Sequence, residues 1–394
     1  MAEPLAGIRV LDFGRFIAAP YCGMLLADLG ADVIRVERRE GGEDRRVGPV
    51  TASGEGGLFL NMNRNKRGMT FTLGHPKSGE ILRRLIGTTD IAIVNLPLQG
   101  MKKLGLDYDS LRSVKKDIIL LMASAFGPDG PYADRVGFDS VAQAMSGAMH
   151  LTGFEPHPVR SIVPFADYGT ALHAALGAMV ALYVRQQTGE GQLIDVSLLA
   201  TSVTFMTPLL AEQAVLGLSR TMQGNTAFHT APSDTYRVKD GWIMVPTIGG
   251  WMFGRWTKLV GRPDLVHDPR FKDDISRANH SSTITEIMSA WCAERTTEEA
   301  MAALEAARLP CGSVYNLDQV LNDPQVKARG IFEPVQYPGG DRPVPLTRSP
   351  LRMSSVPAQP LRRAPLLGEH TDEILSELGF KPEEISAFRS AEVI

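Results

Sequence analysis

Short apolar segments alternate with helical segments over the first part of the chain, and this alternation limits the fold more than any other feature of the sequence. "GIRVLDF" has the pattern of a strand, "APYCGMLLADLG" that of a helix closed by Gly30, and "ADVIRVE" that of a second strand. A strand, a helix and a strand within about 30 residues form a right-handed βαβ unit with parallel strands. "IAIVNL" and "IILLMASAF" continue the series. The sequence therefore predicts an α/β fold with a doubly wound parallel sheet up to about residue 200, with ligands beyond the carboxyl ends of its strands.

The pattern changes near residue 225. "PSDTYRVKDGWIMVP" is typical of a β-hairpin that turns at 239–241, and the helices after it carry more charge. From residue 326 the chain is rich in Pro and Gly, as in an extended strap over a surface, until a last helix in "GEHTDEILSELG". We therefore predict a large α/β part at 1–210, a smaller domain at 225–325, and a strap with a C-terminal helix at 326–394.

The composition argues against several classes of protein. The 41 Lys and Arg and 44 Asp and Glu residues give a net charge of -3, which offers no electrostatic case for nucleic acid or an anionic membrane. The N-terminus lacks a signal-peptide pattern and no run of 18 apolar residues occurs, so we expect a cytoplasmic protein without a membrane span. Cys22, Cys292 and Cys311 lie far apart without CxxC spacing, which argues against a zinc site and a disulfide framework, and we expect no metal.

Asp167 is a lone carboxylate in the apolar stretch "PFADYGTALHAALG". Apolar residues from Tyr168 to Gln186 recur at steps of three and four, which predicts a helix that begins near Asp167. On this pattern alone the favoured interpretation is an N-cap, whose carboxylate accepts hydrogen bonds from the first free N–H groups and contributes about 1 kcal/mol. A catalytic role needs a further reason.

Other candidate sites have two interpretations each. The first strand-to-helix turn reads "FGRFIAAPYCG" and lacks the GxGxxG glycines, so we disfavour a nicotinamide cofactor. Basic clusters at 35–39, 64–67 and 102–103 are each typical of a solvated surface, and together they could hold a phosphate-bearing ligand at the carboxyl edge of the sheet. Gly249 and Gly250 follow a strand, as in a plain turn or in a flexible flap over a neighbouring site.

Several segments together resemble one family, the class III coenzyme A-transferases, which includes formyl-CoA:oxalate and carnitine CoA-transferases. They are "PLAGIRVLDFGRFIAAPYCGMLLADLGADVIRVER", "NRNKRG", "KKLGLDYDSL", "SAFGPDGPYADRVGFDSVAQAMSG", "ADYGTALHAALGAMVALYVRQQTGEGQLIDVSLL", "DPRF" and "PLLGEHTDEIL". Each is weak alone, but their order over nearly the whole chain makes the resemblance specific.

The resemblance implies that Asp167 is a nucleophile which attacks the thioester of an acyl-CoA. A mixed anhydride forms, the CoA thiolate attacks the aspartyl carbonyl to give an aspartyl-CoA thioester, and the steps reverse with the acceptor acid. Acyl-CoA and a small carboxylic acid are then the substrates, and no tightly bound cofactor is required. N–H groups at the start of the helix and a flap at Gly249 and Gly250 would stabilise the oxyanion and exclude water.

The same resemblance implies roles for further residues. Asp139 matches an acid near the reacting centre, and we group it with Asp167 as catalytic. The residues assigned to coenzyme A binding are Phe16, Ile17, Arg38, Lys103 and Arg135, of which the first two would lie beside the thioester.

Two alternatives remain. The α-methylacyl-CoA racemases are a sister family with the same fold and an aspartate at this position. Their second acid–base group is a histidine that would fall at Phe138, and phenylalanine cannot transfer a proton, which disfavours two-base racemisation. The other alternative is a non-catalytic CoA-binding protein. Where many family members read "NFRPG" this chain reads "NLPLQG", and its glycine loop is shorter than in formyl-CoA transferase, which disfavours an oxalate-type enzyme and leaves the acceptor acid open.

The family fold implies two ring-like subunits that interlink. The large Rossmann-like domain would be built from both ends of the chain, with the small α+β domain inserted. The strap at 325–365 suits such a crossover. We therefore expect an obligate homodimer with neither nucleic acid nor a membrane as a partner.

Overall fold

The computed structural model describes residues 3–357 and 359–394, and the chain divides into two compact units. The first unit comprises Met1–Ala148, Ser161–Gly217 and Lys327–Ile394, and the second comprises Met149–Arg160 and Leu218–Val326. The short piece at 149–160 thus belongs to the second unit, although it lies within the predicted large part. The predicted limits at 1–210, 225–325 and 326–394 stay predictions, because contacts within one chain do not show which parts fold independently.

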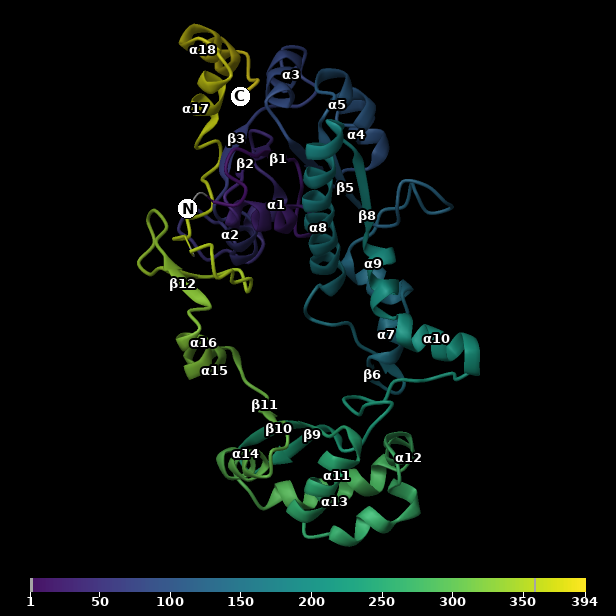
Figure 1. Ribbon diagram of the computed structural model, residues 1–394. Helices are drawn as coiled ribbons and strands as arrows, with labels where there is room; N and C mark the ends of the chain where they lie inside the picture. The colour runs from purple at the N-terminus through teal and green to yellow at the C-terminus, as the bar shows by residue number, and fades with distance from the viewer. Residues whose placement is uncertain (1–2, 358) are drawn as a thin grey trace. The chain divides into compact units, whose positions relative to one another are not determined.

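A six-stranded sheet forms the centre of the first unit (Figure 1). Its strands in spatial order are β3 (Arg67–Thr70), β2 (Asp32–Glu37), β1 (Arg9–Asp12), β4 (Ile91–Val94), β5 (Ile119–Ser124) and β8 (Leu193–Ser197). Every pairing is parallel, and β2 and β4 lie on opposite sides of β1. All of β4 and nearly all of β5 is buried, as expected where helices cover both faces of a parallel sheet. The prediction of a parallel α/β sheet is confirmed.

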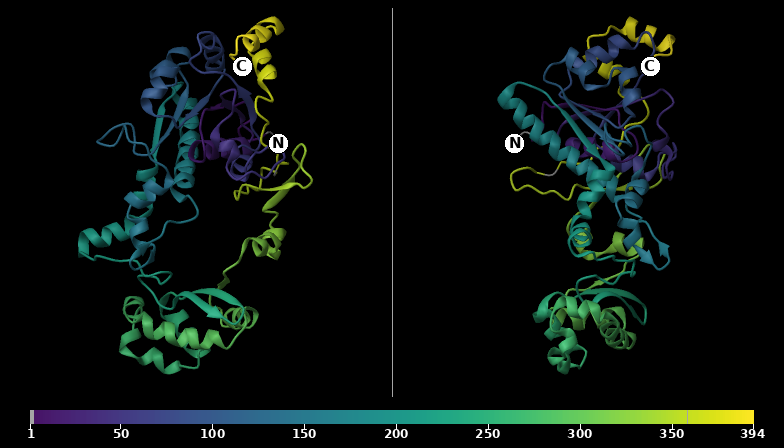
Figure 2. Two further views of the ribbon diagram at one scale, coloured as in Figure 1. Left: turned by 180° about the vertical axis from the view of Figure 1, so that it is seen from behind. Right: turned by 90° about the vertical axis from the view of Figure 1, so that its right-hand side faces the viewer.

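Helices cover both faces of this sheet. One face packs against α1 (Ala18–Asp28) and α8 (Phe165–Thr188), whose buried side consists largely of alanines. The other face packs against α3 (Gly79–Gly87), α4 (Leu98–Leu104), α5 (Tyr108–Val114), α17 (Thr371–Glu377) and α18 (Pro382–Ser390). Figures 1 and 2 show the two yellow C-terminal helices beside α3, so the end of the chain is part of the core of the first unit.

The C-terminal segment also pairs with the edge strand β3. The Gly68 N–H donates to His370 Nδ1 at 3.1 Å, and the Thr70 N–H donates to Thr371 Oγ1 at 3.0 Å. These bonds satisfy backbone groups that an edge strand otherwise leaves exposed.

Two predicted elements differ from the structure. The helix predicted over "GFDSVAQAMSGAMHLTG" is broken into α6 (Asp139–Met145) and α7 (Ala148–Leu151), because Gly147 takes a left-handed φ of 89°. The predicted strap contains an antiparallel hairpin, β12 (Phe332–Val335) and β13 (Val344–Thr347). The first unit also has η1 (Glu43–Arg46), α2 (Gly57–Met62), α9 (Leu198–Phe205) and α10 (Thr207–Leu216).

The second unit is built on the hairpin of β9 (Ser233–Val238) and β10 (Gly241–Pro246), with β11 (Gly312–Ser313) at its side, which confirms the predicted hairpin. Its core surrounds Trp256, Ile243 and Met288. The second unit also contains β6 (Gly153–Phe154), β7 (His157–Pro158), α11 (Gly249–Leu259), η2 (Pro263–His267), η3 (Pro269–Phe271), α12 (Asp274–Asn279), α13 (Ser281–Ala293), α14 (Thr297–Ala306) and α15 (Leu317–Asn322). Helix α16 (Pro324–Ala328) crosses the boundary between the two units.

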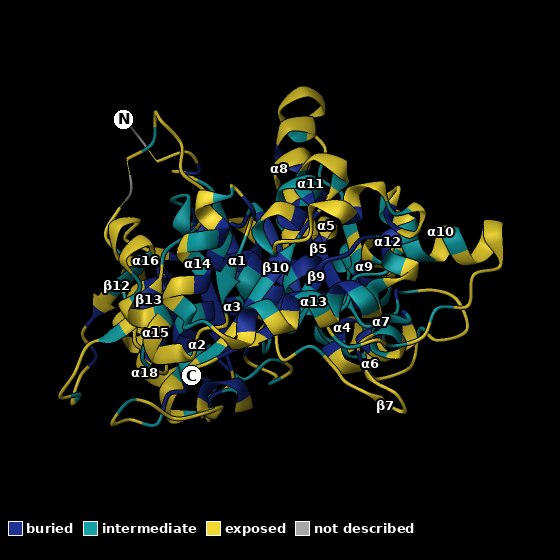
Figure 3. Cartoon of the chain, turned by 90° about the horizontal axis from the view of Figure 1, so that it is seen from below, coloured by how far each residue is buried: buried dark blue, intermediate teal, exposed yellow. Residues whose placement is uncertain are grey.

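Helix α8 has two apolar faces. By length and composition it is the one helix of the described residues that could cross a membrane. Helices α9 and α10, which are bent by 66° relative to each other, are long and apolar enough only if they are taken together. Of the most apolar window of α8, 44% is buried, which corresponds to the side that packs on the sheet. Figure 3 colours much of α8 as exposed, and that exposed surface is apolar too, with Leu172, Leu176, Met179, Val180 and Tyr183.

Candidate active site

Asp167 lies in the first turn of α8, which begins at Phe165. The N-cap position is Pro164, so the interpretation of Asp167 as the N-cap is wrong. The Asp167 carboxylate is half-buried. Among the described residues, no group donates a hydrogen bond to it or forms an ion pair with it.

The capping carboxylate belongs to Asp139, the buried first residue of α6. Its Oδ1 accepts from the Ala166 N–H at 2.8 Å and from the Asp167 N–H at 3.3 Å. Its Oδ2 accepts from Gln143 Nε2 at 2.5 Å, and Gln143 Oε1 accepts from the Ser161 N–H at 2.9 Å. Helix α6 therefore fixes the start of α8 and satisfies two of its free N–H groups.

The N–H groups at the start of α8 are not available to an oxyanion. Asp139 takes two of them, the Phe165 N–H donates to the Val163 carbonyl at 2.8 Å, and the Tyr168 N–H donates to the Pro164 carbonyl at 3.1 Å. The expectation that these groups stabilise the oxyanion is therefore wrong.

The surroundings of Asp167 disfavour its charged form. Burial, followed by the negative charge of Asp139, raises the pKa of Asp167 to about 7. Desolvation penalises the carboxylate, and a nearby like charge adds to that penalty. Near neutral pH this carboxyl group is divided between its two forms, as expected for an acid, a base or a nucleophile in an active site.

Asp167 lines a cavity of about 440 Å³ at the carboxyl ends of β1, β4 and β5. Its walls come from residues after β1 (15, 16 and 18), after β4 (95–99), from the end of β5 and the loop to α6 (122–128 and 133–138), and from Leu198. The rings of Phe16 and Phe138 meet edge to face with centroids 5.8 Å apart. A mostly apolar cavity with few polar groups at this edge of a parallel sheet is typical of a small-molecule site.

The residues predicted to bind coenzyme A are divided by the structure. Phe16 and Arg135 line the cavity, whereas Ile17, Arg38 and Lys103 are not among its lining residues. Ile17 is the N-cap of α1, and Lys103 is exposed on α4. These assignments stay predictions.

The cations nearest the cavity differ in how they are held. The Arg135 guanidinium stacks on the Tyr132 ring with 4.1 Å to its centroid, and no acidic partner of Arg135 occurs among the described residues. Arg15, which also lines the cavity, pairs with Glu43. Arg38 pairs with the same Glu43 at 2.9 Å, so this carboxylate bridges two arginines.

The basic clusters do not all converge on a ligand. Arg64 pairs with Asp28 at 2.6 Å and Lys66 with Asp12 at 2.6 Å, and all four side chains are buried. For these residues the interpretation as a phosphate site is wrong, because their charges are neutralised inside the protein.

Gly249 and Gly250 lie in the second unit and form the first turn of α11. Gly249 has a left-handed φ of 79°, and its N–H donates to both Asp274 carboxylate oxygens at 3.0 Å. The turn is thus anchored at its first residue, and its role as a flap stays a prediction.

Sequence reasoning missed three polar side chains of the site: Arg15, Asn95 and Gln143. Gln143 had a recognisable signal, because it follows Asp139 by four positions on a helix. Arg15 adjoins Phe16, and Asn95 directly follows β4. Their contacts arise only when loops from different strands meet.

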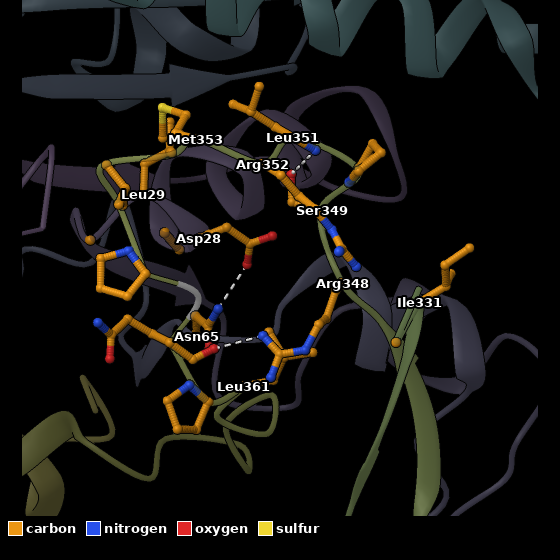
Figure 4. Close-up of a pocket in the computed structure, with 18 of the residues that line it drawn as sticks. Asp28, Leu29, Asn65, Ile331, Arg348, Ser349, Leu351, Arg352, Met353 and Leu361 are labelled. Atoms are coloured by element: carbon orange, nitrogen blue, oxygen red, sulfur yellow. Dashed lines mark hydrogen bonds between the residues drawn. The ribbon is translucent and has the colours of Figure 1, made fainter. Parts of the chain in front are cut away.

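A second cavity of about 1010 Å³ lies in the first unit (Figure 4). Residues 327–331, 348–353, 356–357 and 359–362 line it together with the end of α1. Asn65 contacts both sides of it: its side-chain amide donates to Asp28 Oδ1 at 2.7 Å, and its backbone carbonyl accepts from Arg362 Nη2 at 2.8 Å. No predicted site residue lines this cavity. In the described part of the chain, no group of three or more His, Cys, Asp or Glu side chains is arranged to hold a metal ion.

Comparisons with known proteins place the same chain in context. A family model described as CoA-transferase family III matches residues 5–371. The chain is 31% identical to a succinyl-CoA–D-citramalate CoA-transferase from Chloroflexus aurantiacus over 100% of this chain and 98% of the relative. It is 33% identical to a succinate–glutarate CoA-transferase from Agrobacterium fabrum over 95% and 96%. The crystal structure of a CAIB/BAIF family protein from Brucella suis is 33% identical with a TM-score of 0.85, covering 96% of this chain and 100% of that one.

Proposed function

The chain belongs to CoA-transferase family III, and on that premise we propose that it moves coenzyme A from an acyl-CoA to a free carboxylic acid through covalent bonds to Asp167. The observation that carries the proposal is the state of this carboxylate. It is half-buried, has no hydrogen-bond partner among the described residues, and lines a cavity at the carboxyl edge of the sheet. A poorly solvated carboxylate beside an apolar cavity has the reactivity that acyl transfer requires.

The reaction divides one acyl transfer into four steps. The Asp167 carboxylate attacks the thioester carbonyl, which forms a mixed anhydride and releases the CoA thiolate. The thiolate attacks the Asp167 carbonyl, which forms an aspartyl-CoA thioester and releases the donor acid. The acceptor carboxylate attacks this thioester, which forms a second anhydride and releases the CoA thiolate again, and the thiolate then attacks the acceptor carbonyl. Acyl-CoA leaves and the Asp167 carboxylate is regenerated, so the energy of the thioester is conserved.

Asp139 acts in this scheme without bonding to the substrate. Its hydrogen bonds to two N–H groups hold the first turn of α8, and therefore the Asp167 backbone, in place. Its charge also raises the pKa of Asp167. We assign Asp139 as a positioning residue, with Gln143 supporting it.

The substrates follow from the relatives and from the cavity. The two curated relatives compared above are named for succinate or succinyl-CoA with D-citramalate or glutarate, which supports a dicarboxylic acid as donor and acceptor. Arg135 is the cavity cation without an acidic partner in the described residues, which supports its role in binding coenzyme A. Phe16, Ile17, Arg38 and Lys103 complete this assignment, and coenzyme A is a substrate that is not tightly bound.

The flap and the dimer belong to the same proposal. We propose that Gly249 and Gly250, in the first turn of α11, act as the flap that excludes water from the reacting groups. We propose that two chains interlock as a cytoplasmic homodimer. The exposed apolar side chains on α8 support an association of chains, because neighbouring exposed apolar residues mark interaction surfaces.

Acyl exchange with purified protein tests the function. Succinyl-CoA is offered with a panel of dicarboxylic acids, and new acyl-CoA is measured by mass spectrometry. Asp167→Asn is expected to lower kcat by more than about 10³-fold, as when a covalent nucleophile is removed. Treatment of wild-type protein and succinyl-CoA with hydroxylamine should convert Asp167 to its hydroxamate.

Asp195→Asn is the matched control, because burial and Asp129 also raise the pKa of Asp195, which does not line the cavity. It should keep kcat within about twofold of wild type. Near-normal transfer by Asp167→Asn would refute the nucleophile. Exchange of the α-proton without an acceptor acid would favour the racemase, and binding of acyl-CoA without either reaction would favour a non-catalytic protein.

A further inference from the structure

The loop between β1 and α1, residues 14–16, is held by side chains at nearly every backbone polar group. The Gly14 N–H donates to Asp12 Oδ1 at 2.8 Å. The Arg15 N–H donates to Asn95 Oδ1 at 2.9 Å, and Asn95 Nδ2 donates to the Arg15 carbonyl at 2.8 Å. Arg15 and Asn95 line the cavity, so this loop is a wall of the candidate site.

Two further bonds to the loop come from one buried ion pair. Arg35 Nη1 donates to the Gly14 carbonyl, and Asp44 Oδ2 accepts from the Phe16 N–H at 3.3 Å. Arg35 Nη2 and Asp44 Oδ2 are themselves 2.9 Å apart, and each side chain is only 1% exposed. One ion pair therefore holds the carbonyl of the first loop residue and the N–H of the third.

The ion pair is part of a larger buried set of charges. Lys66 and Asp12 are 2.6 Å apart with no exposure, and Arg35 Nη1 is 4.0 Å from Asp12 Oδ2. Burying four charges costs desolvation free energy that apolar side chains of similar size avoid. Stability alone is therefore a weak reason for charges at this place.

Phe16 supplies a reason, because its backbone is strained. Its φ is 64°, in the left-handed region that non-glycine residues rarely adopt. Such a conformation persists only where the surroundings over-determine it, and it is common in active sites. Its ring lines the cavity that Asp167 lines and meets Phe138 edge to face.

We propose that Arg35 and Asp44 are positioning residues that hold Phe16 in its left-handed conformation, so that its ring is a fixed wall against the acyl thioester. This inference rests on the proposed function. It assigns a role in catalysis to charges that have no contact with the substrate: they orient the reacting carbonyl through the Phe16 ring.

A double-mutant cycle on Asp44 and Phe16 tests the inference. Asp44→Asn removes the charge that holds Arg35, and Phe16→Gly removes both the ring and the need for a held left-handed conformation. Each single variant should lower kcat by about 10- to 100-fold with KM changed by less than about threefold, because the ring contacts only the thioester end of acyl-CoA and its main effect is to orient the reacting carbonyl. In the Phe16→Gly background, Asp44→Asn should cost less than about threefold more.

Asp28→Asn is the control, because it breaks a buried aspartate–arginine pair of the same kind, Asp28 with Arg64, at the far end of α1. It should lower the melting temperature and leave kcat within about twofold. Melting curves show which variants are folded at the assay temperature. If Asp44→Asn is not folded, Asp44→Glu takes its place, since it keeps the charge and displaces the acceptor from the Phe16 N–H.

The outcomes separate the inference from the function beneath it. Losses that multiply in the double variant, an Asp44 variant with unchanged kcat, or an equal loss of kcat in Asp28→Asn would overturn the positioning role while wild-type transfer stands. Absence of transfer and of hydroxamate at Asp167 in wild-type protein would instead overturn the proposed function.

Discussion

Two aspartates that lie 28 positions apart in the sequence meet at the start of α8 and differ in their contacts. Asp139 accepts from two backbone N–H groups and one side-chain amide, whereas Asp167 accepts no hydrogen bond within the described residues. One carboxylate is therefore stabilised where it is, and the other is left reactive. The difference comes from the neighbours and not from the residue type.

The pH dependence of catalysis follows from this environment. Only the charged form of Asp167 attacks a thioester, and burial with the charge of Asp139 raises its pKa to about 7. We expect kcat/KM to rise with pH through a midpoint near 7 and to level off about one to two pH units above it. Asp139→Asn removes the second cause and should move this rise to lower pH, while burial keeps it above the range of an ordinary aspartate. Rate profiles of both proteins measure the shift, and an unchanged midpoint would contradict the role of Asp139.

The same raised pKa should make the folded protein less stable as the pH rises, whereas it makes the enzyme more active. Folding raises the pKa of Asp167 from 3.8 to about 7, so the folded chain binds this proton more tightly than the unfolded chain. Ionisation therefore favours unfolding increasingly as the pH rises through this interval. Asp167→Asn cannot ionise and should melt higher than wild type at pH 8, by about 1 °C for each kcal/mol gained in a chain of this length, with almost no gain near pH 4. An equal gain at both pH values would contradict a raised pKa.

Asp167 also shows what a sequence can reveal about one residue. Its position at a helix start was predictable from the spacing of apolar residues, but the same pattern favoured an N-cap, which is wrong. The true capping group, Asp139, lies on another helix, so no local pattern indicates it. The strain at Phe16 was equally hidden, because phenylalanine at a left-handed position contradicts its own propensity.

At the scale of elements, the sheet was the most predictable part of the chain. β4 and β5 are continuous apolar runs, and these indicate strands that helices cover on both sides. The break between α6 and α7 and the hairpin of β12 and β13 were missed. Both depend on turns whose form is fixed by contacts with other segments, and a single glycine or proline signals them only weakly.

The link between α6 and α8 gives a prediction at this scale. Gln143 bonds Asp139 on one side and the Ser161 N–H on the other, and it is buried. Gln143→Leu leaves these polar groups without a partner and should lower the free energy of unfolding by about 1–3 kcal/mol. It should also lower kcat, because the first turn of α8 carries Asp167. Denaturant unfolding and steady-state kinetics measure the two effects, with the exposed Gln187→Leu as a control.

For the whole molecule, the sequence resemblance supplied more than the pattern of apolar residues did. The family was identified from the order of several weak motifs, and the comparisons over residues 5–371 confirm it. A helix face that binds a second chain would have the same spacing of apolar residues as a face in a core, so the pattern cannot separate the two. The spacing of apolar residues predicted the helix α8 but not which of these residues face outward: Leu176 and Tyr183 are each 63% exposed.

This exposed face leads to a prediction about assembly. Leu172, Leu176 and Tyr183 form an apolar surface on a helix whose opposite side is already packed, so a second chain is the partner that would remove them from water. We expect the melting temperature to rise with protein concentration and unfolding to coincide with dissociation, as for an obligate homodimer. Leu176→Glu should lower the melting temperature or prevent assembly, because it places a charge inside that contact. Lys77→Glu is the control and should change little, because Lys77 is exposed just before α3, on the side of the sheet opposite to α8. A folded, active monomer in analytical ultracentrifugation would show that this face has another purpose.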